Sequence, residues 1–168
     1  MDHPMEVPRF MKRCARCTST APLVGKQVQV SRDVAGHLFI AFVPGQSCTA
    51  CGESYFDART VELFELHVAR KLADAGIAQG DAFRFMRKAI RMQANALAEL
   101  LDVAPETISR WETDKRVASR GASVVLTALV RDACEGRTTT LDCLRRLQRP
   151  HKLEKTVRID LAAKLARS

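Results

Sequence analysis

The sequence has few aromatic residues and no long apolar segment. Aromatic residues make up 5% of the 168 residues, with one tryptophan and one tyrosine, so a core must be built mainly from aliphatic side chains. No apolar run approaches the roughly 20 residues that a membrane helix needs. The first residues, Met1 to Pro4, lead into no apolar segment of the kind found in signal peptides. We therefore expect a soluble, cytoplasmic protein that does not contact a membrane.

Common catalytic motifs are also missing from the sequence. It contains no glycine-rich phosphate loop, no HExxH motif, and no supported arrangement of serine, histidine and aspartate for nucleophilic catalysis. The four histidines are not spaced as metal ligands. We therefore expect that the protein is not an enzyme and has no small-molecule substrate.

The charge of the chain is basic and unevenly distributed. The formal net charge is +8, of which residues 57–168 carry +6 and residues 1–56 carry +2. Hydrophobic residues make up 46% of the chain, as in a folded protein. A basic half favours a polyanionic partner, most often nucleic acid. The alternative is a solvated basic surface with no partner.

Four of the six cysteines form two CxxC pairs, Cys14 with Cys17 and Cys48 with Cys51, and 30 residues separate the pairs. A two-residue spacer lets a tight turn point both sulfurs at one ion, and two such turns complete a tetrahedral shell. Zinc suits four thiolates. Basic neighbours, including Arg16, favour the thiolate form. We therefore predict one structural zinc ion, with no open position for activating water.

Two other interpretations of these cysteines stay open. Each CxxC pair can be a redox pair, although no thioredoxin-like pattern surrounds either of them. Four cysteines can also hold an iron–sulfur cluster. Cys134 and Cys143 are expected to be reduced thiols outside the site.

The segment between the CxxC pairs favours β structure. Val28 and Val30 alternate with glutamines, residues 37–43 form a second β-favouring run, and residues 33–36 supply a turn. Pro44-Gly45 is expected to end the second strand. We predict a small zinc-bound β domain over residues 10–56, because so short a unit has little core of its own.

The rest of the chain has a helical pattern. A linking helix is expected at 58–75 within a segment 57–80, with Asp57 as its N-cap and a turn at Gly76–Gly80. Its inward positions include Val61, Phe64 and Val68. Further helices are expected at 83–92, 93–101, 105–112, 119–134 and 139–147. The predicted fold class is α+β, with an all-α domain over 81–149 and a basic extension over 150–168.

The helices at 93–101 and 105–112, joined by a three-residue turn, fit a helix-turn-helix. Ala98 is small where the helices cross, and Val103 fills the turn. Ile108 and Trp111 lie three residues apart and face the core. The opposite side of the second helix is then available for the major groove of double-stranded DNA.

This placement predicts the DNA contacts. Base contacts are expected from Arg110, Thr107 and Glu106, with Arg110 able to bind guanine in a bidentate manner. Phosphate contacts are expected from Gln93, Ser109, Lys115 and Arg116. The competing role of Arg110 is an ion pair with Glu106 one helical turn away. Glu112 is expected to pair with Arg87 or Arg91.

The segment LAELLDVAPETISRWETDKR resembles the helix-turn-helix of the Xre/Cro family, with Leu97-Ala98, Val103, Ile108-Ser109 and Trp111-Glu112 in register. Together with the two CxxC pairs, residues 14–135 resemble the MqsA-like antitoxins, which carry a YgiT-type zinc finger. The chain departs from these patterns at Ala94, Ala104 and Glu106, where the families carry a phosphate-contacting Gln, a Ser or Thr cap and a base-reading Asn. Arg110 matches a base-reading Arg of the antitoxins.

The resemblance implies a homodimeric repressor that binds an operator palindrome and regulates its own operon. It also implies that the zinc domain binds a partner toxin. A solitary regulator of the same architecture is the first expectation, an antitoxin is the second, and a zinc-ribbon scaffold for protein or RNA is the third.

The C-terminal segment from Arg145 to Arg158 has six basic residues and one Glu. It is open to three interpretations: a second DNA-contacting arm, a dimer element or a solvated extension. Residues 156–161 alternate like a strand and can pair with a partner's sheet edge.

Overall fold

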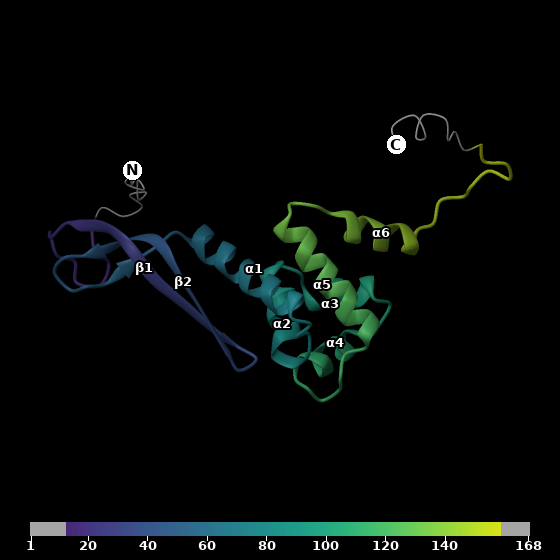
Figure 1. Ribbon diagram of the computed structural model, residues 1–168, viewed down its shortest axis with the longest axis horizontal. Helices are drawn as coiled ribbons and strands as arrows, with labels where there is room; N and C mark the ends of the chain where they lie inside the picture. The colour runs from purple at the N-terminus through teal and green to yellow at the C-terminus, as the bar shows by residue number, and fades with distance from the viewer. Residues whose placement is uncertain (1–12, 159–168) are drawn as a thin grey trace.

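The computed structural model describes residues 13–158, which fold as an α+β protein with a three-stranded sheet followed by helices (Figure 1). The sheet extends away from the helical part, so the described chain is elongated. The sheet and the helices confirm the predicted α+β fold class. Within residues 13–158, no helix is long and apolar enough to cross a membrane.

The sheet is antiparallel, with strand order β1-β2-β3. The strands are β1 (Leu23–Val34), β2 (His37–Cys48) and β3 (Ser54–Tyr55). Val34 pairs with His37, so only Ala35 and Gly36 form the hairpin turn. Both have positive φ, 53° and 75°, as a two-residue hairpin with the twist of its strands requires.

The prediction that Pro44-Gly45 ends the second strand is wrong, because β2 continues to Cys48. A Cβ on Gly45 would lie 2.6 Å from the carbonyl oxygen of Tyr55 and 2.7 Å from Cγ2 of Val28. Glycine therefore allows this close approach of the chain around Tyr55. Pro44 is tolerated because β3 pairs only with Gln46 and Ser47, so β2 has one neighbour at Pro44.

Six helices follow the sheet within residues 13–158. They are α1 (Ala58–Asp74), α2 (Gly80–Ala89), α3 (Ala94–Leu100), α4 (Pro105–Glu112), α5 (Arg120–Cys134) and α6 (Thr139–Gln148). Asp57 caps α1 by accepting a hydrogen bond from the Arg59 N–H, as predicted. The bounds of α4 match the prediction, whereas α2 begins three residues earlier than expected.

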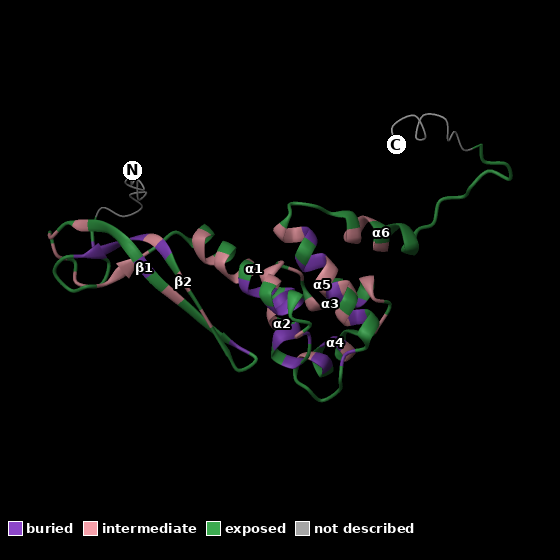
Figure 2. Ribbon diagram, viewed as in Figure 1, coloured by how far each residue is buried: buried purple, intermediate pink, exposed green. Residues whose placement is uncertain are grey.

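The core lies among α1 to α5, where the buried residues gather in Figure 2. Phe83, Met86, Leu97, Ile108 and Leu126 are fully buried there. Phe85 and Ala89 of α2, and Ile90 just after it, are only half-buried. Because α2 begins at Gly80, Phe83 lies in its first turn and faces the core with Met86.

The tip of the β1–β2 hairpin contacts the helices. Val34 is 1% exposed and belongs to the core shared with α1 and α2. The Ala35 N–H donates to Oδ2 of Asp81 over 3.3 Å, and Arg32 forms an ion pair with Glu65. The sheet is therefore joined to the helical part at its hairpin end.

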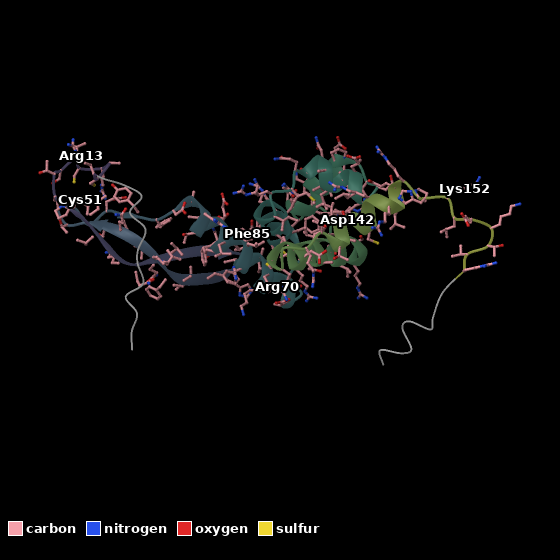
Figure 3. All side chains as sticks on the ribbon, turned by 90° about the horizontal axis from the view of Figure 1, so that it is seen from above. Arg13, Cys51, Arg70, Phe85, Asp142 and Lys152 are labelled. Atoms are coloured by element: carbon pink, nitrogen blue, oxygen red, sulfur yellow. The ribbon has the colours of Figure 1, made fainter. Side chains whose placement is uncertain are left out.

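Residues 150–158 form neither helix nor strand. The strand that the sequence predicted over 156–161 is therefore absent from 156–158, and residues 159–161 lie outside the described chain. Figure 3 shows Cys51 near one end of the molecule and Lys152 near the other.

Candidate metal centre and candidate nucleic-acid interface

The four cysteines of the CxxC pairs lie together at the end of the sheet farthest from the helices (Figure 3). All four Sγ atoms lie within 4.8 Å of one another, with 3.5 Å between Cys14 and Cys51 and 3.7 Å between Cys17 and Cys48. This confirms the predicted cluster. Four sulfur donors at this separation form a set that could hold a metal ion.

Two short turns position the sulfurs. The Thr18 N–H donates to the Cys14 carbonyl over 3.2 Å, and the Gly52 N–H donates to the Cys48 carbonyl over 2.9 Å. Thr18 and Gly52 both have positive φ, 51° and 75°. Each CxxC segment thus closes into a turn that brings its two sulfurs to the same side.

Tyr55 is a part of this site that sequence reasoning missed. Its hydroxyl oxygen lies 3.1 Å from Sγ of Cys14 and accepts hydrogen bonds from the N–H groups of Ala15 and Arg16. The hydroxyl, together with the Cys17 N–H, lowers the pKa of Cys14 to about 6. The one available signal was position, because the only tyrosine of the chain follows Cys51 by four residues.

The sequence attributed the low thiol pKa to basic neighbours, but the tyrosine hydroxyl has the larger effect on Cys14. The guanidinium of Arg16 instead pairs with Glu53 over 2.7 Å. At Cys51, the Glu53 N–H lowers the pKa, but burial and the three neighbouring thiols outweigh it and raise the pKa to about 12. The pKa values of Cys14 and Cys51 therefore shift in opposite directions.

The two cysteines outside the cluster are free thiols, as predicted. Cys134 is half-buried, with its Sγ 3.6 Å from the Leu66 carbonyl, and burial raises its thiol pKa. Cys143 is exposed on α6. Neither lies in the four-cysteine group.

The second candidate site is the pair α3 and α4. Their contact buries Leu97, Ala98 and Ile108, each at most 1% exposed. The Val103 N–H donates to the Ala98 carbonyl over 3.0 Å and closes the turn between the helices. Trp111 is 5% exposed and packs edge-on against Phe83, as the predicted core position requires.

An ion pair fixes the end of α4 to α2. Arg87 donates to both carboxylate oxygens of Glu112, over 2.5 and 3.1 Å, and its third contact is the Met92 carbonyl at 2.6 Å. Both side chains are 9% exposed. Of the two predicted partners of Glu112, Arg87 is confirmed, while Arg91 pairs with Glu62 of α1.

The outer side of α4 is open to solvent. Glu106, Ser109 and Arg110 are exposed and Thr107 is half-buried. In the described chain, Arg110 forms no ion pair, so the competing Glu106–Arg110 pair is not formed. The buried and exposed sides of this helix are thus clearly separated.

The remaining predicted contact residues lie around α4. Gln93 precedes α3 as its N-cap and is exposed, with no side-chain hydrogen bond to the helix. Lys115 and Arg116 are exposed in the segment between α4 and α5. This segment also includes Val117, 74% exposed, and leads to Arg120 at the start of α5.

No protein-family model matches the chain, and no curated protein matches it. Two features of the described chain bear on its function. One is the four-cysteine cluster, and the other is the exposed face of α4 with its basic flank.

Proposed function

We propose that the protein is a sequence-specific regulator of transcription that binds double-stranded DNA through α3 and α4 as a helix-turn-helix. The observation that carries this proposal is the two-sided character of α4. One side buries Ile108 and Trp111, and the other exposes Arg110 without an acidic partner. Such a helix suits the major groove, where Arg110 can bind O6 and N7 of guanine with about 1–3 kcal/mol of discrimination.

The other residues have separate roles in this proposal. Thr107 contacts a thymine methyl group, and Glu106 accepts from a cytosine amino group. Gln93, Ser109, Lys115 and Arg116 contact phosphates and set the position of α4 along the groove. The phosphate contacts are supported by the exposure of these four side chains on or beside the outer side of α4. Lys115 and Arg116 also form no ion pair within residues 13–158.

The regulator is proposed to act as a homodimer and repressor, including repression of its own promoter. One eight-residue helix offers few base contacts, whereas two copies double them on a palindromic site. The proposed domains are the zinc-binding unit 10–56, the linking helix 57–80, the DNA-binding unit 81–149 and the extension 150–168.

We propose one structural zinc ion at the cysteine cluster. Four soft thiolate donors suit zinc and leave no position for a substrate. Cys14, Cys17, Cys48 and Cys51 would hold the ion, and Tyr55 would steady the Cys14 thiolate. When bound, the ion would cross-link the two turns. This cross-link would stabilise a three-stranded sheet whose own core is small.

Selection from a pool of random duplexes tests the proposal. We expect enrichment of a palindrome whose half-sites lie about one helical turn apart, roughly 10 base pairs. Arg110→Ala should lose the preference at one position in each half-site and keep the others. Lys71→Ala, at an exposed position of α1, is the control and should select the wild-type sequence. Absence of any enriched sequence would contradict the proposal.

A second candidate function, that of an antitoxin, is favoured by an apolar stripe on β2. Leu38, Ile40 and Phe42 lie on one face of the sheet and are 63, 52 and 68% exposed. Their β1 neighbours in register are Asp33, Ser31 and Gln29, so no apolar side chain of β1 covers them. A partner toxin would bury this stripe.

Co-purification with the products of adjacent genes tests the antitoxin function. We expect a stable complex that Phe42→Ser abolishes and Leu63→Ser leaves intact, because Leu63 is similarly exposed but lies on α1. A complex equally stable in both variants, or no complex, would leave the solitary regulator as the function.

A further inference from the structure

The arginines of the described chain divide into paired and unpaired sets. Seven of them form ion pairs with acidic residues: Arg16, Arg32, Arg70, Arg87, Arg91, Arg131 and Arg137. These pairs lie in the cysteine-bearing turns, the sheet and the helical body. Their charges are locally neutralised and contribute little to attraction of a distant polyanion.

Six unpaired basic residues are scattered over the first CxxC turn, β1, α1 and α2: Arg13, Lys26, Arg59, Lys71, Arg84 and Lys88. The other unpaired basic residues of the described chain gather in two parts. The first surrounds α4 and includes Arg110, Lys115, Arg116 and Arg120. The second extends from α6 to the end of the described residues: Arg145, Arg146, Arg149, Lys152, Lys155 and Arg158. All six of the second set are exposed, and none forms an ion pair within residues 13–158.

The second set has a regular spacing. From Arg146 to Arg158 a basic residue occurs at every third position, interrupted by no acid at those positions. After α6, which ends at Gln148, an extended chain rises about 3 Å per residue, so the charges from Arg149 to Arg158 lie about 9–10 Å apart. Duplex DNA has one phosphate per about 1.7 Å of its axis. Each charge of such a chain can therefore reach a phosphate.

Helix α6 fixes the point from which this segment leaves the helical body. At its start, Oδ2 of Asp132 accepts from the Thr140 N–H over 2.6 Å. At its end, the Gln148 side-chain amide donates to the Glu99 carbonyl over 2.8 Å, which ties α6 to α3. Leu141 and Leu144 pack against the core between these two points. The segment therefore begins beside the proposed helix-turn-helix.

We propose that residues 145–158 form a phosphate-binding arm that follows the backbone of duplex DNA outside the half-site bound by α4. This inference rests on the proposed DNA-binding function. The ten residues 149–158 span at most about 35 Å when extended, close to one turn of the duplex. Figure 3 shows this segment, with Lys152, projecting from the body. The arm supplies affinity and salt dependence, while α4 supplies sequence preference.

Charge-neutralised variants test the arm. The arm variant carries Arg149→Gln, Lys152→Gln, Lys155→Gln and Arg158→Gln, all of which lie after α6. The control variant carries Lys26→Gln, Arg59→Gln, Lys71→Gln and Arg84→Gln, which remove the same charge at exposed, unpaired positions of β1, α1 and α2. Affinity for a mixed-sequence duplex and for the selected operator is measured as a function of salt.

Log affinity falls as log salt concentration rises, and each phosphate contact makes this fall steeper by about 0.9. We expect the slope to become shallower by at least about 2 in the arm variant and by less than about 1 in the control variant. The ratio of operator to mixed-sequence affinity should stay within about threefold in the arm variant, because phosphate contacts carry no sequence information. Circular dichroism should show unchanged helix content.

The other outcomes separate the arm from the proposed function. If the arm variant keeps the wild-type slope while Arg110→Ala loses the preference at the base position that it contacts, the arm is wrong and the DNA-binding function stands. If the wild-type protein binds neither duplex, both fail. If the arm variant weakens binding to a single-stranded RNA of equal length more than to the duplex, the segment is an RNA-binding element and the proposal is overturned.

Discussion

Arg87 and Glu112 are 25 positions apart, and their side chains meet in a two-pronged ion pair that joins α2 to the last residue of α4. Arg87 also bonds to the Met92 carbonyl, just before α3 begins. One guanidinium therefore connects α2, the entrance to α3 and the end of α4. This contact holds the proposed recognition helix at a fixed angle to its support.

Breaking this pair should destabilise the helical part strongly. Glu112→Ala leaves the buried guanidinium of Arg87 without its carboxylate, and we expect a loss of about 3 kcal/mol. The double variant Arg87→Met with Glu112→Leu should lose less than the sum of the single losses. Urea unfolding followed by fluorescence of Trp111, the only tryptophan, measures both. A loss below about 0.5 kcal/mol for Glu112→Ala, typical of surface pairs, would contradict this account.

Metal content should depend on the four clustered cysteines and not on the others. We expect one zinc ion per wild-type chain, and its loss in Cys48→Ser, because Cys48 is buried between the turns. Elemental analysis of the purified proteins measures this, with Cys143→Ser as the exposed control. Iron in the wild-type protein would support the iron–sulfur interpretation, and an undiminished metal content in Cys48→Ser would place the ion elsewhere.

The anchoring of α6 should weaken in acid. The Thr140 N–H, with Arg137, lowers the pKa of Asp132 below its ordinary value. A lowered folded-state pKa stabilises the fold above the unfolded-state pKa of about 3.9, and this stabilisation disappears as the pH falls through the folded-state value. The difference in unfolding free energy between wild type and Asp132→Asn should therefore be constant from about pH 7 to 5 and shrink below about pH 4. A difference that grows as the pH falls would contradict this prediction.

Two glycines should respond oppositely to substitution by alanine. At Gly45 the added Cβ meets the Tyr55 carbonyl and Val28, so the sheet should lose about 1–3 kcal/mol. At Gly121, in the first turn of α5, nothing lies within 4 Å of the added Cβ, so Gly121→Ala should stabilise by about 0.5 kcal/mol. Amide hydrogen exchange in β2 and α5 measures the two effects. Faster exchange in α5 of Gly121→Ala, or unchanged exchange in β2 of Gly45→Ala, would contradict these expectations.

Local patterns predicted the parts of the fold that depend on neighbours in sequence. The bounds of α4 followed from Pro105 at its first turn and from the spacing of Ile108 and Trp111. The cysteine cluster followed from the two-residue spacers of the CxxC pairs. In both cases, residues close in sequence fix the geometry.

The features that the sequence did not predict depend on contacts between distant segments. The sequence predicts a strand end at Gly45, because the closeness of Gly45 to Val28 and Tyr55 arises only when the three strands are assembled. Tyr55 reaches Cys14 across 41 positions. The burial of Val34 against the helices also joins segments that no periodicity connects.

Binding to the promoter upstream of the protein's own gene tests whether the protein recognises DNA sequence through Arg110. Wild type and Arg110→Ala are compared at two salt concentrations against an excess of random duplex, with Lys71→Ala as control. We expect tight binding that resists the random competitor in wild type and control and is lost in Arg110→Ala, weakening steeply with salt in the proteins that bind. Weak binding that random DNA abolishes equally in all three proteins would contradict such recognition.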